Sequence, residues 1–189
     1  MRQALQNDIS GYLLRRGMPS DAGQLSQLAI KAFCETFSHY DEAERMKFLS
    51  TYYCAEKFLA ELQQPESHFW IVADGEEFIA YMNVGPVTLP YKSKYERTVQ
   101  LSRLYVLNSH KRQGIGQQLM ARVLDYAIAE KADAIILGVW ENNILAQNFY
   151  DQCGFKVVGE YFYPPIGKFV DRELIMCKEL PSFRNEKHE

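Results

Sequence analysis

The sequence predicts one α/β domain, in which helices cover a mixed β-sheet. Short apolar and aromatic runs, such as residues 68–73 and 134–140, are typical of strands. Longer segments, such as residues 114–131, carry apolar residues at helical spacing. The length of 189 residues suits a single domain, 1–189, and we expect an N-terminal extension at 1–10 and a flexible tail at 181–189.

Seven strands and four helices are predicted in all. The predicted strands are residues 12–16, 68–73, 78–84, 99–107, 134–140, 155–161 and 173–178. One predicted helix begins near residue 21, and three more span residues 41–62, 114–131 and 144–153. A loop with two prolines covers residues 85–96. Asp41 and Glu44 mark the second helix, because both side chains can satisfy free backbone amides at a helix N-terminus. The run at 134–140 is apolar without alternation, which predicts a strand buried on both faces.

Composition excludes several classes of protein. The formal net charge of -3 offers no general basic surface, so we expect no nucleic-acid partner. No stretch approaches the ~20 apolar residues of a membrane helix, and the first ten residues lack the apolar core of a signal peptide. The four cysteines and four histidines lack metal-ligand spacing. We therefore expect a cytoplasmic protein with reduced thiols, no metal and no membrane partner.

The most informative segment is the glycine-containing turn between the strand at 99–107 and the next helix. The first N–H groups of a helix lack internal partners and suit an anion. Gly114 and Gly116 allow a phosphate to approach those amides, and Lys111 and Arg112 add cationic donors. The segment therefore predicts a phosphate or pyrophosphate site, with a simple tight turn between helix and sheet as the alternative.

Two other nucleotide-binding motifs fit this turn poorly. The Walker string Gly-x-x-x-x-Gly-Lys-Ser/Thr is absent. A dinucleotide-binding fingerprint needs a third glycine where this chain has Leu119. Asp133 lies about 20 residues further on, as a ribose-binding acid would, but it precedes the next strand instead of ending it.

Combined with downstream residues, the turn resembles a known family. The spacing of Lys111, Gly114 and Gly116 is followed by Asn143-x-x-Ala-x-x-Phe-Tyr150 and then by Gly154-Phe. Over residues 101–160 this combination resembles the GNAT (Gcn5-related) N-acetyltransferases. Residues 37–40, 137–141 and 174–176 are similar to the PaiA-type bacterial spermidine/spermine N-acetyltransferases within that family.

The resemblance implies a fold, an activity and site residues. The fold is the GNAT fold, a central mixed twisted sheet flanked by about four helices, with strands splayed at the cofactor site. The activity is acetyl transfer from acetyl-CoA to a primary amine of a small molecule, a polyamine such as spermidine or spermine. The implied cofactor-binding residues are Leu104, Tyr105, Val106, Lys111, Arg112, Gln113, Gly114, Ile115, Gly116, Gln117 and Asn143.

Catalytic roles follow from the same resemblance. The Val106 amide would polarise the thioester carbonyl, and Tyr150 would protonate the departing sulfur. From spacing alone, however, Tyr150 reads as core packing and Asn143 as a helix cap. Residues 100–104 contain no acid where many family members carry a glutamate, so the general base stays unassigned.

The acceptor side is less constrained by the sequence. The candidate substrate-binding residues are Phe37, His39, Tyr40 and Glu141, with loops at 37–42, 85–96 and 161–165 as walls. Glu141 reads equally well as a solvated loop acid. Four acidic side chains in or near the first loop are candidates for attracting a polycation: Glu35, Asp41, Glu42 and Glu44.

Three other functions stay open from the sequence alone. The acceptor of the acetyl group is alternatively a protein or peptide amine. The domain is alternatively a non-catalytic coenzyme A sensor, or an oxidoreductase that binds a nicotinamide cofactor. The closing strands are compatible with a homodimer, although no spacing in the sequence indicates one.

Overall fold

The computed structural model describes residues 7–9 and 11–181, which form an eight-stranded sheet and five α-helices. The strands are β1 (Asn7–Ile9), β2 (Tyr12–Arg16), β3 (His68–Asp74), β4 (Glu77–Gly85), β5 (Thr98–Val106), β6 (Ala134–Trp140), β7 (Lys156–Phe162) and β8 (Arg172–Glu179). The α-helices are α1 (Ala22–Thr36), α2 (Glu42–Tyr52), α3 (Ala55–Leu62), α4 (Ile115–Ala129) and α5 (Ile144–Gln152). Two short 3-10 helices cover Pro19–Asp21 and Asn108–His110.

The sheet is mixed and opens at its centre. The strand order is β1-β2-β3-β4-β5-β6-β8-β7, and every neighbouring pair is antiparallel except β5 and β6. These two parallel strands pair only where Thr98–Leu101 meets Ala134–Leu137. Both strands continue beyond this point and diverge, which confirms the predicted splayed sheet of the GNAT fold.

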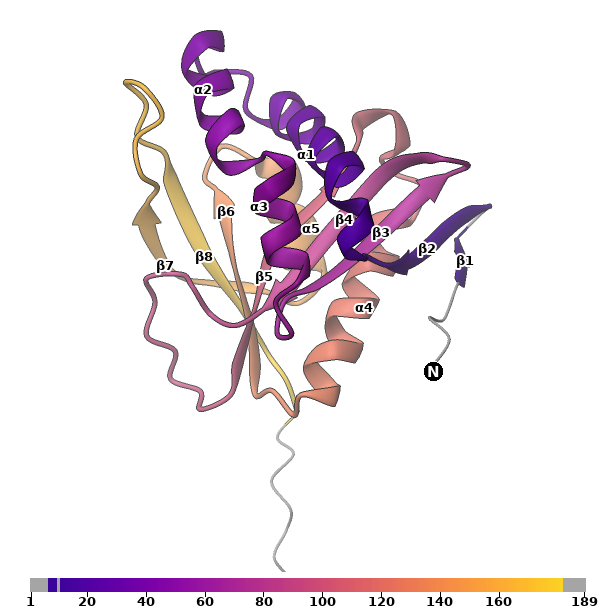
Figure 1. Cartoon of the computed structure of the whole chain (residues 1–189). Coiled ribbons are helices and arrows are strands. Elements are labelled where there is room, and N and C mark those ends of the chain that lie inside the picture. Colours follow the sequence, from indigo (N-terminus) through magenta and orange to yellow (C-terminus); the bar gives the residue numbers. More distant parts are fainter. Residues whose placement is uncertain (1–6, 10, 182–189) are drawn as a thin grey trace, which may run out of the picture.

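Helices cover both faces of the sheet (Figure 1). On one face, α1 and α3 bury a core that includes Leu25, Phe58 and Tyr81. On the other face, α4 buries Leu119 and Val123 against the strands and against residues of α5. The unalternating run in β6 is buried on both sides as predicted, because one side packs in the α4 core and the other packs under the loop at residues 87–95.

The helix predicted at residues 41–62 is wrong in one respect, because the structure divides it into α2 and α3. The break lies at Tyr53 and Cys54, where Cys54 adopts an extended backbone conformation. The Ser26 hydroxyl of α1 donates a hydrogen bond to the Tyr53 carbonyl at 2.5 Å. This tertiary contact stabilises a turn that contains no glycine or proline, so no local sequence signal marks the break. The described residues therefore form five α-helices instead of the four expected.

Both chain ends fall partly outside the described residues. Within the expected N-terminal extension, 1–10, residues 7–9 form β1 and pair with β2, and the others lie outside the described residues. Of the expected tail, 181–189, only Pro181 is described. None of the helices described is long and apolar enough to cross a bilayer.

Candidate active site

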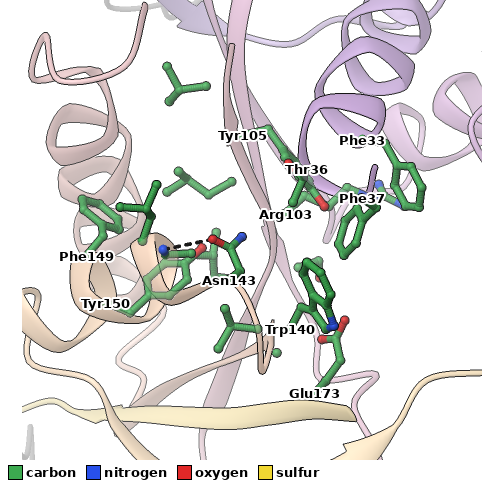
Figure 2. Close-up of a pocket in the computed structure, with 18 of the residues that line it drawn as sticks. Phe33, Thr36, Phe37, Arg103, Tyr105, Trp140, Asn143, Phe149, Tyr150 and Glu173 are labelled. Atoms are coloured by element: carbon green, nitrogen blue, oxygen red, sulfur yellow. Dashed lines mark hydrogen bonds between the residues drawn. The ribbon is translucent and has the colours of Figure 1, made fainter. Parts of the chain in front are cut away.

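The diverging ends of β5 and β6 open onto a cavity of about 1100 Å³. Its walls come from both strands, from the start of α4, from α5, and from loops at residues 36–40, 88–90 and 161–164. Figure 2 shows Tyr150 and Asn143 on one side of this space, with Trp140 and Glu173 on the other. Drug-sized ligands typically occupy about 300–1,000 Å³, so the cavity has room for a large ligand beside a small one.

Most residues singled out by the sequence meet in this cavity. Those that line it are Leu104, Tyr105, Val106, Lys111, Arg112, Gly114, Ile115, Gly116, Gln117, Asn143, Tyr150, Phe37 and Tyr40. Three others, Gln113, His39 and Glu141, do not line it. All three predicted loops contribute residues to its wall.

The glycine-containing turn forms one end of the cavity. Gly114 has a φ of +82° and Arg112 a φ of +63°, so two left-handed positions flank Gln113. Backbone that switches between left- and right-handed conformations gathers N–H groups into a concave anion site. Because α4 begins at the next residue, Ile115, its first N–H groups add to the same positive region.

The two glycines of the turn lie in different surroundings. A Cβ on Gly114 would meet nothing within 4 Å, so this position faces open space and its positive φ is what requires glycine. A Cβ on Gly116 would lie 3.4 Å from the Phe149 ring. This is an ordinary van der Waals contact, so the start of α4 lies against α5 but the contact does not by itself require glycine.

β5 presents an unpaired backbone edge to the cavity. Its pairing with β6 ends at Leu101, so Leu104, Tyr105 and Val106 have no strand neighbour on that side. Ser102 also lacks a partner on β4, because the register shifts between Asn83 and Val84. An extended ligand that carries amides can pair with such an edge as an added strand would.

Tyr150 belongs to the core and to the cavity at once. It is only 7% exposed, and its ring packs against Phe149 and Phe155 with centroids 5.4 and 5.9 Å away. The same side chain lines the cavity. Burial, followed by the charges of Cys153 and Glu173, raises the pKa of Tyr150 above its usual value, so its hydroxyl remains protonated at neutral pH.

Asn143 caps α5 and faces the cavity. Its side-chain oxygen accepts a hydrogen bond from the Ala146 amide at 3.2 Å, drawn as the dashed line in Figure 2. This contact confirms the predicted helix cap. Because the cap uses the oxygen, the amide nitrogen is the group that Asn143 can offer to a ligand.

Aromatic rings dominate the other end of the cavity. Phe37 lies 5.5 Å from Trp140 and 4.5 Å from Phe33 between ring centroids, and all three line the cavity. Tyr40 and Tyr163 extend this wall. Such rings bury apolar chain and attract a cation over their faces.

The three residues outside the cavity wall have partners elsewhere. The Gln113 side chain accepts a hydrogen bond from the Tyr12 hydroxyl at 2.7 Å. His39 stacks on Trp140 at 4.4 Å and lies 3.2 Å from an Asp171 carboxylate oxygen. Glu141 forms an ion pair with Arg172 at 2.6 Å. Gln113 still has its backbone amide in the turn, whereas His39 and Glu141 lie outside the cavity wall, next to Trp140.

Sequence reasoning missed an ion pair in the cavity wall. Arg103 donates to both oxygens of Glu61, at 2.5 and 3.0 Å, and lies over the rings of Tyr53 and Phe58. The hydrogen bonds and the negative charge of Glu61 keep the pKa of Arg103 above its usual value despite burial. No local sequence signal marks this pair, since Glu61 is 42 residues distant from Arg103 in sequence.

Sequence reasoning also missed Glu173, an acid that lines the cavity beside Trp140. Its carboxylate accepts a hydrogen bond from the Tyr161 hydroxyl at 3.2 Å. Burial raises the pKa of Glu173 from 4.5 to about 7, although the bond from Tyr161 acts in the opposite direction. The available signal was an acid opening an apolar strand.

The acids expected to attract a polycation lie outside the cavity wall. Glu35 accepts a hydrogen bond from the Asn108 amide at 2.8 Å, and Asp41 pairs with Lys168 at 3.3 Å. The acids that do line the cavity are Glu61 and Glu173. Among the described residues, no group of three or more metal-binding side chains is close enough to hold an ion.

The turn before α4 and the edge of β5 fit the two halves of acetyl-CoA. The turn before α4 offers backbone N–H groups and the exposed cations Lys111 and Arg112 to a diphosphate. The unpaired edge of β5 offers donors and acceptors to the amides of a pantetheine arm. The thioester would then lie between Tyr150 and the aromatic end.

Comparisons with known proteins agree with this geometry. Residues 25–155 match the model of the Acetyltransferase (GNAT) family. Human N-acetyltransferase 8 is 30% identical over 102 residues, which is 54% of this chain and 44% of that protein. An uncharacterized N-acetyltransferase from Lactobacillus delbrueckii subsp. lactis is 24% identical over 156 residues, 82% of this chain and 90% of the relative.

Solved structures share the fold. The PaiA N-acetyltransferase of Thermoplasma acidophilum, solved in complex with coenzyme A, has a TM-score of 0.74 and is 19% identical, covering 89% of this chain and 99% of that chain. This chain spans less than half the length of the human relative, so the likeness to that protein concerns one part of it. The family model covers more than two thirds of the 189 residues, and the chain therefore belongs to the acetyltransferase (GNAT) family.

Proposed function

We propose that this protein transfers the acetyl group of acetyl-CoA to a primary amine of a small cationic molecule, with polyamines such as spermidine and spermine as the best candidates. One observation carries the proposal. A single cavity joins the amide-rich turn before α4 to an aromatic end that contains Glu173. Such a cavity brings an acyl donor and an amine together in a defined orientation.

Backbone groups hold the donor in this proposal. The amides of residues 111–117 bind the pyrophosphate, with Lys111 and Arg112 adding charge. Leu104, Tyr105 and Val106 align the pantetheine arm, and the Val106 amide donates to the thioester oxygen as negative charge develops there. Asn143 contacts the same arm through its amide nitrogen.

Tyr150 acts as the general acid. The amine nitrogen attacks the thioester carbon, the carbon–sulfur bond breaks, and the sulfur takes the hydroxyl proton of Tyr150. Burial keeps this phenol protonated, which supports the role. The neighbouring Phe149 and Phe155 hold the ring in place.

The aromatic end supports a cationic acceptor. Phe37, Tyr40 and Trp140 present rings to the cavity, and rings attract an alkylammonium group. Arg103 is neutralised by two hydrogen bonds to Glu61, so it offers little attraction to an acidic acceptor. The similarity of residues 37–40 to PaiA-type enzymes supports a polyamine in particular.

A panel of acceptors tests the proposal. Release of coenzyme A thiol is measured with spermidine, spermine, an aminoglycoside and a peptide with a free amine. The proposal expects the polyamines to give the highest kcat/KM. A preference for the peptide would assign a protein acceptor, and acetyl-CoA binding without turnover on any amine would favour the sensor.

A further inference from the structure

The proposed reaction needs a base that the glycine-containing motif does not supply. An alkylammonium group has an ordinary pKa of about 10.4, so the acceptor arrives protonated and cannot attack. The strand before the motif carries Gln100 instead of an acid. The Gln100 side-chain oxygen accepts hydrogen bonds from the Thr88 and Leu89 amides at 2.7 and 3.0 Å, which ties the loop at 86–95 to the sheet. Gln100 is therefore occupied by a structural task.

Glu173 is placed by the sheet where such a base is needed. In the strand order β6-β8-β7, Glu173 lies directly opposite Trp140 on one side and Tyr161 on the other. Side chains of directly opposed residues share a face of the sheet. Figure 2 shows Glu173 beside Trp140, across the cavity from Tyr150.

Gly138 makes room for this carboxylate. A Cβ at position 138 would lie 2.7 Å from the Glu173 Oε2 and 3.1 Å from the Tyr161 hydroxyl. Any other residue at this point of β6 would displace the acid or its hydrogen-bond donor. The one glycine in the buried run of β6 thus adjoins Glu173.

The surrounding charges leave Glu173 without a cationic partner. Arg172, next to it in the chain, pairs with Glu141 and Glu160. Arg103 is held by Glu61. Within residues 7–9 and 11–181, no ion pair of Glu173 is found, and its side-chain hydrogen bond comes from Tyr161. A carboxylate at the aromatic end is therefore free to bind an ammonium group.

We propose that Glu173 binds the ammonium group of the acceptor in the aromatic end of the cavity and removes its proton before acetyl transfer. This role rests on the proposed acetyl transfer to an amine. The raised pKa of Glu173, about 7 because of burial, supports it, since a base near neutrality is both available and strong enough to accept a proton.

The proton and electron balance is complete. Glu173 takes one proton from the ammonium nitrogen, whose lone pair then forms the bond to the thioester carbon. The electrons of the carbon–sulfur bond leave with sulfur, which takes the Tyr150 proton. The second nitrogen proton restores Tyr150 through solvent, and Glu173 releases its proton to water, so acetyl-CoA and ammonium yield the amide, the thiol and one proton.

Other ionisable groups act on this site and bear on its pH dependence. Burial raises the pKa of five surrounding tyrosines, and the charge of Glu173 adds to each shift: Tyr40, Tyr105, Tyr150, Tyr161 and Tyr163. All five phenols stay neutral near pH 7. The Asp171 carboxylate adds to the pKa of Glu173, and it accepts a hydrogen bond from Tyr40 and lies 3.2 Å from His39. Because His39 contacts Asp171, the test includes a His39 variant as well.

Glu173→Gln, assayed with an alkylamine and with a weakly basic amine that is neutral at the assay pH, tests the role. The wild type is expected to gain kcat/KM with pH up to an apparent pKa of about 7. The variant loses this limb and loses about 100-fold in kcat/KM for the alkylamine, while the weakly basic amine loses much less because it needs no base. Acetyl-CoA affinity, measured by calorimetry, stays unchanged and shows that the variant folds.

Matched variants separate the base from its surroundings. Glu160→Gln removes a carboxylate of β7 outside the cavity and leaves the profile unchanged. Tyr161→Phe removes the bond that favours the carboxylate, so the apparent pKa moves upward. If Glu173 produces the rise of kcat/KM with pH, this rise persists in His39→Gln.

Three results would overturn the role of Glu173. They are full activity of Glu173→Gln, an equal loss of kcat/KM for both amines, or a rise of kcat/KM with pH that disappears in His39→Gln. Failure of the wild type to acetylate any amine while binding acetyl-CoA would instead remove the proposed function, and the role of Glu173 with it.

Discussion

Burial raises the pKa of both Tyr150 and Glu173, but the consequence for proton transfer differs between the two groups. Tyr150 becomes a weaker acid that stays protonated, and Glu173 becomes a stronger base that titrates near pH 7. A pair of titratable groups with divergent pKa values is a common arrangement for acid–base catalysis. The two side chains line one cavity from α5 and from β8.

Tyr150→Phe is expected to reduce turnover about 100-fold, the low end for a general acid, because a thiolate leaves more readily than an amine. Acetyl-CoA affinity stays the same, since the ring and its contacts with Phe149 and Phe155 remain. Thiol-release kinetics and binding calorimetry measure the two quantities. Tyr126→Phe, on α4 outside the cavity, serves as the control, and equal effects of both variants would contradict the assignment.

Glu173 should cost the fold stability at neutral and higher pH. Its pKa is raised from 4.5 to about 7 on folding, so the unfolded chain loses the proton first and stability falls as pH rises between these values. At 1.36 kcal/mol per unit, the cost above pH 7 is about 3 kcal/mol. Glu173→Gln is therefore expected to raise the melting temperature above pH 7 and to leave it unchanged well below pH 4.5. A constant difference across this range would contradict the shifted pKa.

At the scale of elements, the glycine-containing turn and the splayed strands act together. The turn before α4 contains left-handed Arg112 and Gly114, and β5 continues past its last pair with β6 at Leu101. Polar backbone groups that a regular sheet and helix would satisfy internally are thus left for a ligand. The strain of a left-handed arginine is a cost that the turn sustains at its cofactor site.

Gly114→Ala is expected to weaken acetyl-CoA binding roughly tenfold, because the strained turn shifts its amides and the new methyl group faces the cavity. Its folding stability should fall by about 1 kcal/mol. Gly75→Ala is the matched control, since Gly75 also has a positive φ, of +58°, in open space but lies in the β3–β4 hairpin. Equal acetyl-CoA affinity in the two variants would contradict the assigned role of the turn.

The elements also show what the sequence could predict. Every predicted strand is found, because apolar runs and the Asp74-Gly75 hairpin signal are local. The break between α2 and α3 was missed, because a hydroxyl from α1 stabilises it. Glu173 and Gly138 were missed for a similar reason: their contact depends on which strands are neighbours, and β8 lies between β6 and β7.

At the scale of the whole molecule, one sheet divides the work between its two faces. The face that carries α4 and α5 supplies the glycine-containing turn and Tyr150 (Figure 1). The face that carries α1, α2 and α3 supplies Phe33 and Phe37, which meet Trp140 of β6 at the aromatic end. The gap between β5 and β6 connects them. The proposed reaction centre therefore lies where β5 and β6 are no longer paired.

Hydrogen exchange of individual backbone amides, with and without acetyl-CoA, tests the central claim most directly. The account predicts slower exchange at residues 104–106 and 112–117 when acetyl-CoA is bound. Amides of residues 75–77 in the β3–β4 turn, which do not line the cavity, should exchange as before. Protection confined to other segments, or unchanged exchange at the turn and at β5 under saturating acetyl-CoA, would contradict the placement of the donor between the two strands.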